Sequence, residues 1–140
     1  MIVLDASVAI KWYFPEVGSD DAIDLLNGQT RELIVPDIFV VEVTAALVRK
    51  ANMEKARAGV IQGLIDDFLG RIAGGTLQAH RLSASGAREA AQLAVNLGHP
   101  LKDCIYLALA MELGCPLITA DARFAAKVRE VYGQVRVLGA

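Results

Sequence analysis

The sequence has few of the residues that build the commonest sites of small proteins. Its 140 residues include two cysteines and two histidines, and the cysteines lack the CxxC spacing of zinc ribbons and redox centres. Neither GxGxxG nor GxxxxGK[ST] occurs, which disfavours a dinucleotide site or a P-loop. We therefore expect Cys104 and Cys115 to be buried, reduced thiols of a cytoplasmic protein.

The sequence also lacks a long hydrophobic run. Its longest apolar stretches, residues 38–48 and 104–111, are shorter than the roughly 20 residues that cross a bilayer. The amino terminus has no basic lead and contains Asp5, so we expect neither a signal peptide nor a membrane segment. The chain is nevertheless 54% hydrophobic with a mean hydropathy of +0.41. This much apolar surface on a small chain predicts a homodimer or a protein partner.

Positive charge is too scarce for a protein that wraps a polyanion. The 14 Lys and Arg residues are outnumbered by 16 Asp and Glu, for a formal net charge of −2. This balance argues against a protein that coats nucleic acid by bulk electrostatic attraction. Any contact with nucleic acid must be local or assisted by metal ions.

What the sequence does contain is an alternation of short apolar strands with helices. This alternation predicts an α/β protein over residues 1–140, a single domain with three α/β/α layers and a mostly parallel central sheet. Residues 38–48 and 53–72 predict a helical hairpin, and the first of these is so apolar that we expect it to be buried between layers. The expected strands are residues 1–4, 33–35, 77–82, 116–119 and 135–137, and the expected helices are residues 6–14, 19–28, 38–48, 53–72, 83–98, 101–110 and 123–131.

Four acids stand where such a sheet binds its ligands. Asp5 and Asp121 directly follow apolar strands, whereas Glu42 and Asp103 lie in the first turns of helices that leave the same edge. In a parallel sheet the strand ends and helix starts share one edge, so the four carboxylates are expected to converge. Like charges at close range destabilise one another unless a cation neutralises them. The pattern predicts a divalent-metal site.

Each acid also has a structural interpretation when it is taken singly. Asp5 suits a helix N-cap, Asp103 complements a helix dipole, and Glu42 could fill a packing gap or pair with an arginine. Asp37 is expected only to cap a helix. The two histidines are expected to be structural rather than ligands: His80 and His99.

Oxygen ligands alone, without histidine or cysteine, select Mg²⁺ or Mn²⁺ over zinc. Mg²⁺ usually keeps several waters, so the remaining ligands would be waters and a substrate phosphate, which points to phosphoryl-transfer chemistry. Ser7 and Thr119 are candidates to hold such waters or the phosphate. The weaker candidates for phosphate contacts are basic residues near the acids in sequence: Lys11, Lys102 and Arg123.

Four stretches carry a resemblance to a known family: residues 3–12, 36–42, 100–110 and 117–125. In these contexts the chain resembles the PIN-domain nucleases, and most closely the toxins of VapBC-type bacterial toxin-antitoxin modules. The resemblance implies a PIN-like fold and a metal-dependent endoribonuclease whose ions are gathered by Asp5, Glu42, Asp103 and Asp121. It also implies a cytoplasmic toxin homodimer, held inactive by a small antitoxin that covers the acidic cleft.

Two other functions fit the same sequence. A PIN fold without activity could serve as an interaction protein, and a housekeeping RNA-processing nuclease could share every feature named above. Other proteins with acids at this edge fit less well. A dehalogenase-type phosphatase needs Asp-x-Asp after the first strand, where this chain has Asp5 and then Ser7.

Overall fold

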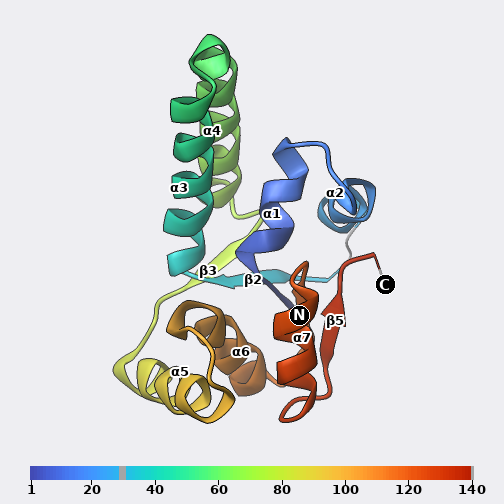
Figure 1. The fold of residues 1–140 in the computed structure, drawn as a ribbon, viewed down its shortest axis with the longest axis vertical. Coiled ribbons are helices and arrows are strands. Elements are labelled where there is room, and N and C mark those ends of the chain that lie inside the picture. Colours follow the sequence, from blue (N-terminus) through green and yellow to red (C-terminus); the bar gives the residue numbers. More distant parts are fainter. Residues whose placement is uncertain (29–30, 140) are drawn as a thin grey trace.

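The computed structural model describes residues 1–28 and 31–139, which form a five-stranded sheet between two layers of helices (Figure 1). All strand pairs are parallel, and the strand order is β3-β2-β1-β4-β5. This arrangement confirms the predicted three-layer architecture. The strands are β1 (Ile2–Leu4), β2 (Leu33–Pro36), β3 (Gln78–His80), β4 (Leu117–Thr119) and β5 (Val135–Val137).

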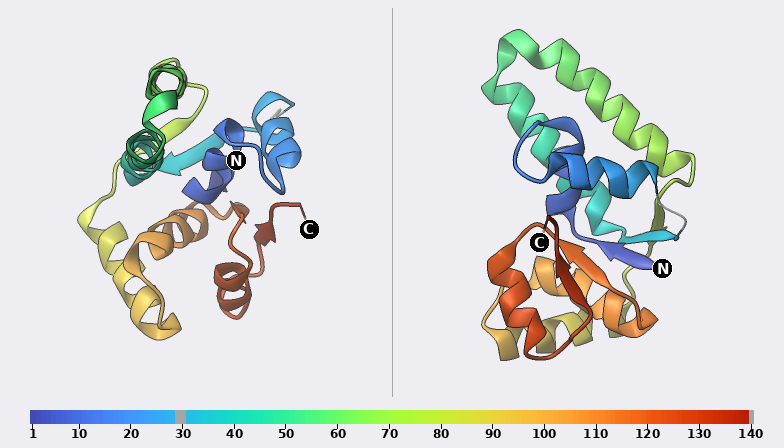
Figure 2. Two further views of the ribbon diagram at one scale, coloured as in Figure 1. Left: turned by 45° about the horizontal axis from the view of Figure 1, so that its top comes forward. Right: turned by 90° about the vertical axis from the view of Figure 1, so that its right-hand side faces the viewer.

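The helices lie on opposite sides of the sheet according to their place in the chain. In Figures 1 and 2, α1 to α4 cover one face, whereas α5 to α7 cover the other. Within the second layer, α6 packs against β1, β2 and β4, and α7 packs against β5. The helices are α1 (Ala6–Tyr13), α2 (Ser19–Asn27), α3 (Ile38–Met53), α4 (Ala58–Ala73), α5 (Ala84–Leu97), α6 (Leu101–Leu113) and α7 (Ala122–Arg129), with a 3₁₀ turn, η1 (Lys55–Arg57), before α4.

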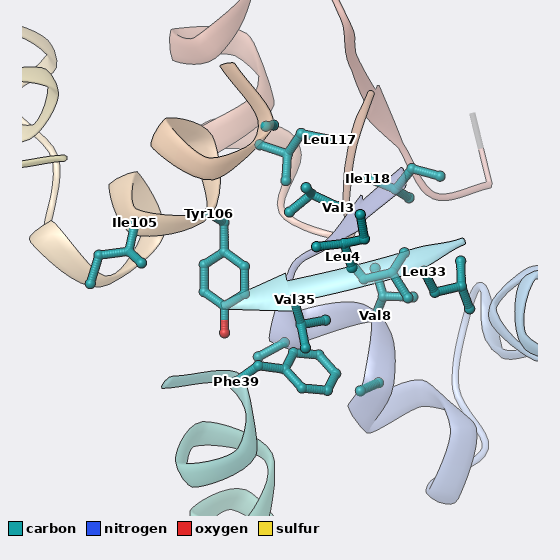
Figure 3. Packing of buried hydrophobic residues seen from close by; sticks show 14 of the residues in the cluster. Val3, Leu4, Val8, Leu33, Val35, Phe39, Ile105, Tyr106, Leu117 and Ile118 are labelled. Carbon is teal, nitrogen blue, oxygen red and sulfur yellow. The ribbon is translucent and has the colours of Figure 1, made fainter. Parts of the chain in front are cut away.

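The first strand, β1, is the centre of the sheet because its residues are apolar on both faces. Ile2, Val3 and Leu4 are all buried. Val3 pairs with Ile34 of β2 on one side and with Leu117 of β4 on the other. Figure 3 shows these strands packed between α6 and the layer that contains α1 and α3. Burying such side chains stabilises the fold by about 1.5–3 kcal/mol each, so the position of β1 is fixed by its own composition.

The sheet changes its direction of growth at β1. The chain places β2 and then β3 on one side of β1, and afterwards β4 and β5 on the other side. The connections therefore diverge at the carboxyl ends of β1 and β4. In open parallel sheets such a divergence leaves a crevice at the strand ends, which is the usual place for a ligand.

The hairpin of α3 and α4 projects beyond the sheet (Figure 1). Only the face with Phe39, Val43 and Leu47 is buried, whereas Val41 is 67% exposed and Val48 is 43% exposed. The prediction of a helix buried between layers was therefore wrong, because an all-apolar helix does not reveal which face meets the core. Both α3 and α4 are 16 residues long. No helix within residues 1–28 and 31–139 is long and apolar enough to cross a membrane.

Helix ends agree with the predictions in some places and correct them in others. Ser83 caps α5 by accepting the Gly86 N–H at 3.0 Å, as expected. The sequence also offers Ser19 and Asp20 as caps for the second helix, but the residue before α2 is Gly18, with φ of 89°. Asp37 precedes α3 but forms no side-chain hydrogen bond to it, so its predicted capping role was wrong.

Gly98 ends α5 in the left-handed conformation (φ 60°), which an L side chain adopts at a cost of about 1–2 kcal/mol. Gly98→Ala is therefore expected to lower the free energy of unfolding by about 1 kcal/mol. Gly63 lies exposed inside α4, where alanine meets no neighbour within 4 Å. Gly63→Ala should raise the free energy of unfolding by about 0.5–1 kcal/mol, because alanine favours a helix more than glycine does. Urea denaturation measures the change in the free energy of unfolding for each variant. Changes in the same direction for both variants would contradict the left-handed conformation of Gly98 or the helical environment of Gly63.

Candidate active site

All four predicted acids line one open cleft of about 390 Å³ at the carboxyl edge of the sheet. Asp5 comes from the end of β1, Glu42 from α3, Asp103 from α6 and Asp121 from the turn after β4. The side of the cleft formed by α3 is otherwise mainly apolar, apart from Arg49 at its far end. The cleft lies at the divergence between β1 and β4. Acids from four separate parts of the chain thus meet at the carboxyl edge of the sheet, as the sequence predicted.

Asp5 is buried at the floor of the cleft, with 5% of its surface exposed. Its Oδ2 accepts hydrogen bonds from Ser7 Oγ and Thr119 Oγ1, both at 2.7 Å. Burial raises the pKa of Asp5, and these two hydrogen bonds only partly offset that effect. Although Asp5 stands at the N-cap position of α1, its side chain forms no capping hydrogen bond. The interpretation of Asp5 as a helix cap was therefore wrong.

Ser7 and Thr119 are themselves oriented by the backbone around Ala120. Ser7 Oγ accepts the Ala120 N–H at 3.0 Å, and Thr119 Oγ1 accepts the Asp121 N–H at 3.1 Å. Because each oxygen already accepts from a backbone amide, each hydroxyl directs its hydrogen to Asp5. The two residues that were expected to hold waters or a phosphate thus hold the carboxylate of Asp5.

Glu42 is half-buried on α3, and its Oε1 has no hydrogen-bond partner among the described residues. Burial raises the pKa of Glu42; Lys102 counteracts this effect, whereas Asp5 and Asp103 add to it. The Tyr106 hydroxyl is also buried without a hydrogen-bond partner in residues 1–28 and 31–139, and burial and the charge of Glu42 both raise its pKa. Figure 3 shows this hydroxyl pointing from α6 toward the start of α3. An acceptor oxygen without a donor favours a cation as its missing partner.

Asp103 lies in the first turn of α6 and has a partner that sequence reasoning did not assign to it. His99 Nε2 lies 2.6 Å from Asp103 Oδ2, and the His99 ring stacks on Phe124 with a centroid distance of 4.7 Å. His99 was expected to be structural, and its contact with Asp103 places it next to the cleft. The sequence did contain a signal for this contact: His99 and Asp103 are four residues apart, a spacing that brings side chains together in a helix.

Asp121 differs from Asp5 more than its place after a strand suggests. It is exposed, and its Oδ1 accepts the backbone N–H groups of Arg123 and Phe124 at 3.0 Å, which caps α7. One oxygen of Asp121 therefore stabilises a helix start while the residue lines the cleft. Asp5 and Asp121 both follow strands, as the sequence indicates, but Asp5 is buried whereas Asp121 is exposed.

The three basic candidates are separated by the fold. Lys102 lines the cleft, together with Arg49, which was not predicted. Lys11 Nζ instead donates to Val17 O at 2.6 Å and to Glu16 Oε1 at 3.0 Å, which anchors the α1–α2 loop. Arg123 is exposed on α7 and is not among the cleft-lining residues. Arg49 and Lys102 are therefore the cations available to a ligand in the cleft.

The donor set suits a hard divalent cation, although the acids are not gathered into one coordination shell. Among the described residues, no three His, Cys, Asp or Glu side chains are close enough to hold one metal ion. Mg²⁺ needs only one or two carboxylates and completes its shell with water and substrate oxygens. Three features fit such an ion: the unpartnered Glu42 oxygen, the raised pKa values of Asp5 and Glu42, and a cleft lining without histidine or cysteine.

Comparison with known families agrees with this fold and cleft. The PIN domain model matches residues 2–130. The ribonuclease VapC12 of Mycobacterium tuberculosis is 32% identical over 127 residues, which cover 89% of this chain and 90% of that protein. The chain therefore belongs to the PIN domain family.

Solved structures with little sequence identity share the fold. A toxin-antitoxin complex from Klebsiella pneumoniae aligns with a TM-score of 0.66 at 17% identity, over 98% of this chain and 97% of that chain. The sarcin-ricin loop cleaving toxin VapC20 of M. tuberculosis aligns with a TM-score of 0.66 at 15% identity, over 90% of this chain and 94% of that chain. The arrangement of helices and strands is thus retained where most side chains differ.

The raised pKa of Glu42 predicts a pH-dependent effect on stability. Because the folded state raises this pKa, ionised Glu42 weakens the fold above the pKa of the unfolded chain. Glu42→Gln should therefore increase the free energy of unfolding at pH 7 in the presence of EDTA. The increase should vanish as the pH falls below about 4, where the carboxyl is protonated in both states.

Urea denaturation at the two pH values measures this effect. Glu89→Gln, on the exposed surface of α5, is the matched control and should change stability little at either pH. Equal stability of wild type and Glu42→Gln at pH 7 would contradict the described surroundings of Glu42.

Proposed function

We propose that this chain is a metal-dependent endoribonuclease that hydrolyses RNA phosphodiester bonds, and that it is the toxin of a toxin-antitoxin pair. The observation that carries the proposal is the meeting of Asp5, Glu42, Asp103 and Asp121 in one cleft, at the topological divergence of a PIN-domain sheet. The 32% identity to the ribonuclease VapC12 supports RNA as the substrate.

Asp5 and Asp103 are proposed as the principal ligands of Mg²⁺ or Mn²⁺, with Glu42 and Asp121 nearby. When bound there, a divalent cation would neutralise the acids and promote attack of water on a phosphodiester. The hydroxyls of Ser7 and Thr119 hold Oδ2 of Asp5, which leaves Oδ1 for the cation. The site needs no histidine ligand, in keeping with its hard oxygen chemistry.

Glu42 is proposed to accept the proton of the attacking water. Its Oε1 forms no hydrogen bond in the described part of the chain. Burial raises the pKa of Glu42 toward the pH at which it would act, which makes the carboxylate a better proton acceptor. Loss of that proton from water accompanies formation of the new P–O bond, while the bond between phosphorus and the leaving nucleoside oxygen breaks and that oxygen takes a proton from solvent.

RNA binding is proposed to be local to the cleft. Arg49 from α3 and Lys102 from α6 stand on its two sides and can contact phosphates that flank the scissile bond. The net charge of −2 leaves little attraction for RNA elsewhere. This arrangement favours a short recognised segment over a long duplex.

The antitoxin and a second copy of the chain are the proposed partners. The α3–α4 hairpin exposes Val41 and Val48 on one helix and Val60 on the other, so that apolar surface remains for a protein to cover. Sedimentation of the purified chain should show a homodimer. Its expression without an antitoxin should arrest growth of the host, which a housekeeping nuclease would not do.

Asp103→Asn is expected to lower RNA cleavage by more than about 100-fold, since even the residues that merely support metal ligands contribute about 10–100-fold. Cleavage of a mixed structured RNA is measured with Mg²⁺, with Mn²⁺ and with EDTA. The fold should survive, because an asparagine carbonyl can still accept from His99 Nε2 at this position.

Asp24→Asn, on an exposed part of α2, is the matched control and should cleave like wild type. Cleavage that persists in EDTA or in the Asp103→Asn variant would contradict the proposal. Folded wild-type protein that binds Mn²⁺ but cleaves no RNA would favour the inactive interaction protein.

A further inference from the structure

His99 is held by three residues from two helices. The turn between α5 and α6 places it there: the His99 N–H donates to Ala94 O at 3.0 Å, and Pro100 follows as the N-cap residue of α6. The ring stacks on buried Phe124 at an interplanar angle of 27°. Its Nε2 lies 2.6 Å from Asp103 Oδ2, and its Nδ1 lies 3.3 Å from Lys127 Nζ. With 11% of its side chain exposed, the imidazole has little freedom to turn.

The two neighbours of the ring select the same tautomer. The Lys127 ammonium can only donate hydrogen bonds, so Nδ1 facing it must be the bare, accepting nitrogen. The ring hydrogen is then on Nε2, where the Asp103 carboxylate accepts it. Lys127 is itself held in place by a hydrogen bond to Gly98 O at 3.2 Å. A continuous chain of donors therefore runs from Lys127 through His99 to Asp103.

We propose that His99 is a positioning residue that holds Asp103 Oδ2 through its Nε2–H group, with Lys127 fixing the tautomer, so that Oδ1 of Asp103 is presented to a divalent cation. This inference rests on the proposed metal-dependent function. Asp103 is on the first turn of a helix at the rim of a cleft, with 29% of its side chain exposed, and would otherwise sample several rotamers. Donors that orient carboxylate ligands typically contribute about 10–100-fold to metal affinity.

His99→Phe separates hydrogen bonding from packing. Phenylalanine retains an aromatic ring that can stack on Phe124, but it cannot donate to Asp103. We expect this variant to bind Mn²⁺ at least about tenfold more weakly, while its thermal unfolding midpoint stays close to that of wild type. His99→Gln, which keeps an N–H donor, should recover part of the affinity. His80→Gln, on edge strand β3 and outside the cleft lining, is the matched control and should bind like wild type.

Nuclear magnetic resonance tests the tautomer without any metal. The chain has two histidines, so the His80→Gln variant identifies the ring signals of His99 directly. Long-range ¹H–¹⁵N correlations should show a protonated Nε2 and a bare Nδ1 in wild type. Lys127→Met should shift the ring toward a mixture of tautomers and weaken Mn²⁺ binding less than His99→Phe does. A wild-type ring that carries its hydrogen on Nδ1 would overturn the proposal.

The remaining outcomes separate this inference from the proposed function. If His99→Phe binds Mn²⁺ as tightly as wild type, His99 does not position Asp103, and the metal site itself still stands. If wild type binds no Mn²⁺, the metal proposal fails and the positioning role fails with it. Loss of the Nε2 hydrogen when Mg²⁺ is added would overturn the positioning role in favour of direct coordination by His99.

Discussion

The desolvation of Asp5 is the constraint on which the site depends. The Asp5 carboxylate cannot become solvent-exposed without moving β1, because this strand is buried on both faces and sets the position of Asp5. Its charge is tolerated through two hydroxyl donors, Ser7 and Thr119, and each of these is in turn oriented by a backbone amide beyond β4. The stability of β1 and β4 therefore supports the geometry of the cleft, and the remaining charge favours a cation.

The sequence predicted the layers and the meeting of the acids because both follow from local patterns. Short apolar segments next to breaks such as Pro36 and Gly114 are recognisable as strands. Parallel connections then bring the carboxyl ends of these strands to one edge of the sheet. The edge position of β3 was also predictable from its weak alternation, and the structure confirms it. What the pattern did not contain was the surroundings of each acid: Asp5 and Asp121 look alike in sequence, yet one is buried and the other caps a helix.

Other features depended on contacts between residues far apart in the chain. The apolar sequence of α3 gave no periodic signal for its exposed face, which is set by how far the helix runs past the sheet. The contact of His99 with Lys127 joins residues 28 positions apart, so no local rule reveals it. Tyr106 likewise appeared as one more apolar position in α6, whereas its hydroxyl points toward the start of α3 (Figure 3), and burial and the charge of Glu42 both raise its pKa. Local patterns predicted where the four acids lie, and long-range packing decides what surrounds each of them.

The start of α7 links two of the acids that the cleft brings together. Asp121 accepts the Phe124 N–H, the Phe124 ring supports His99, and Lys127 one turn later donates to the same imidazole. One short helix thus connects the cap at Asp121 with the two residues that contact His99, the partner of Asp103. In Asp5, Asp103 and Asp121, the hydrogen bonds engage one carboxylate oxygen and leave the other for a ligand. A cation in the cleft would then meet carboxylates whose orientation is already set, which lowers the entropic cost of binding it.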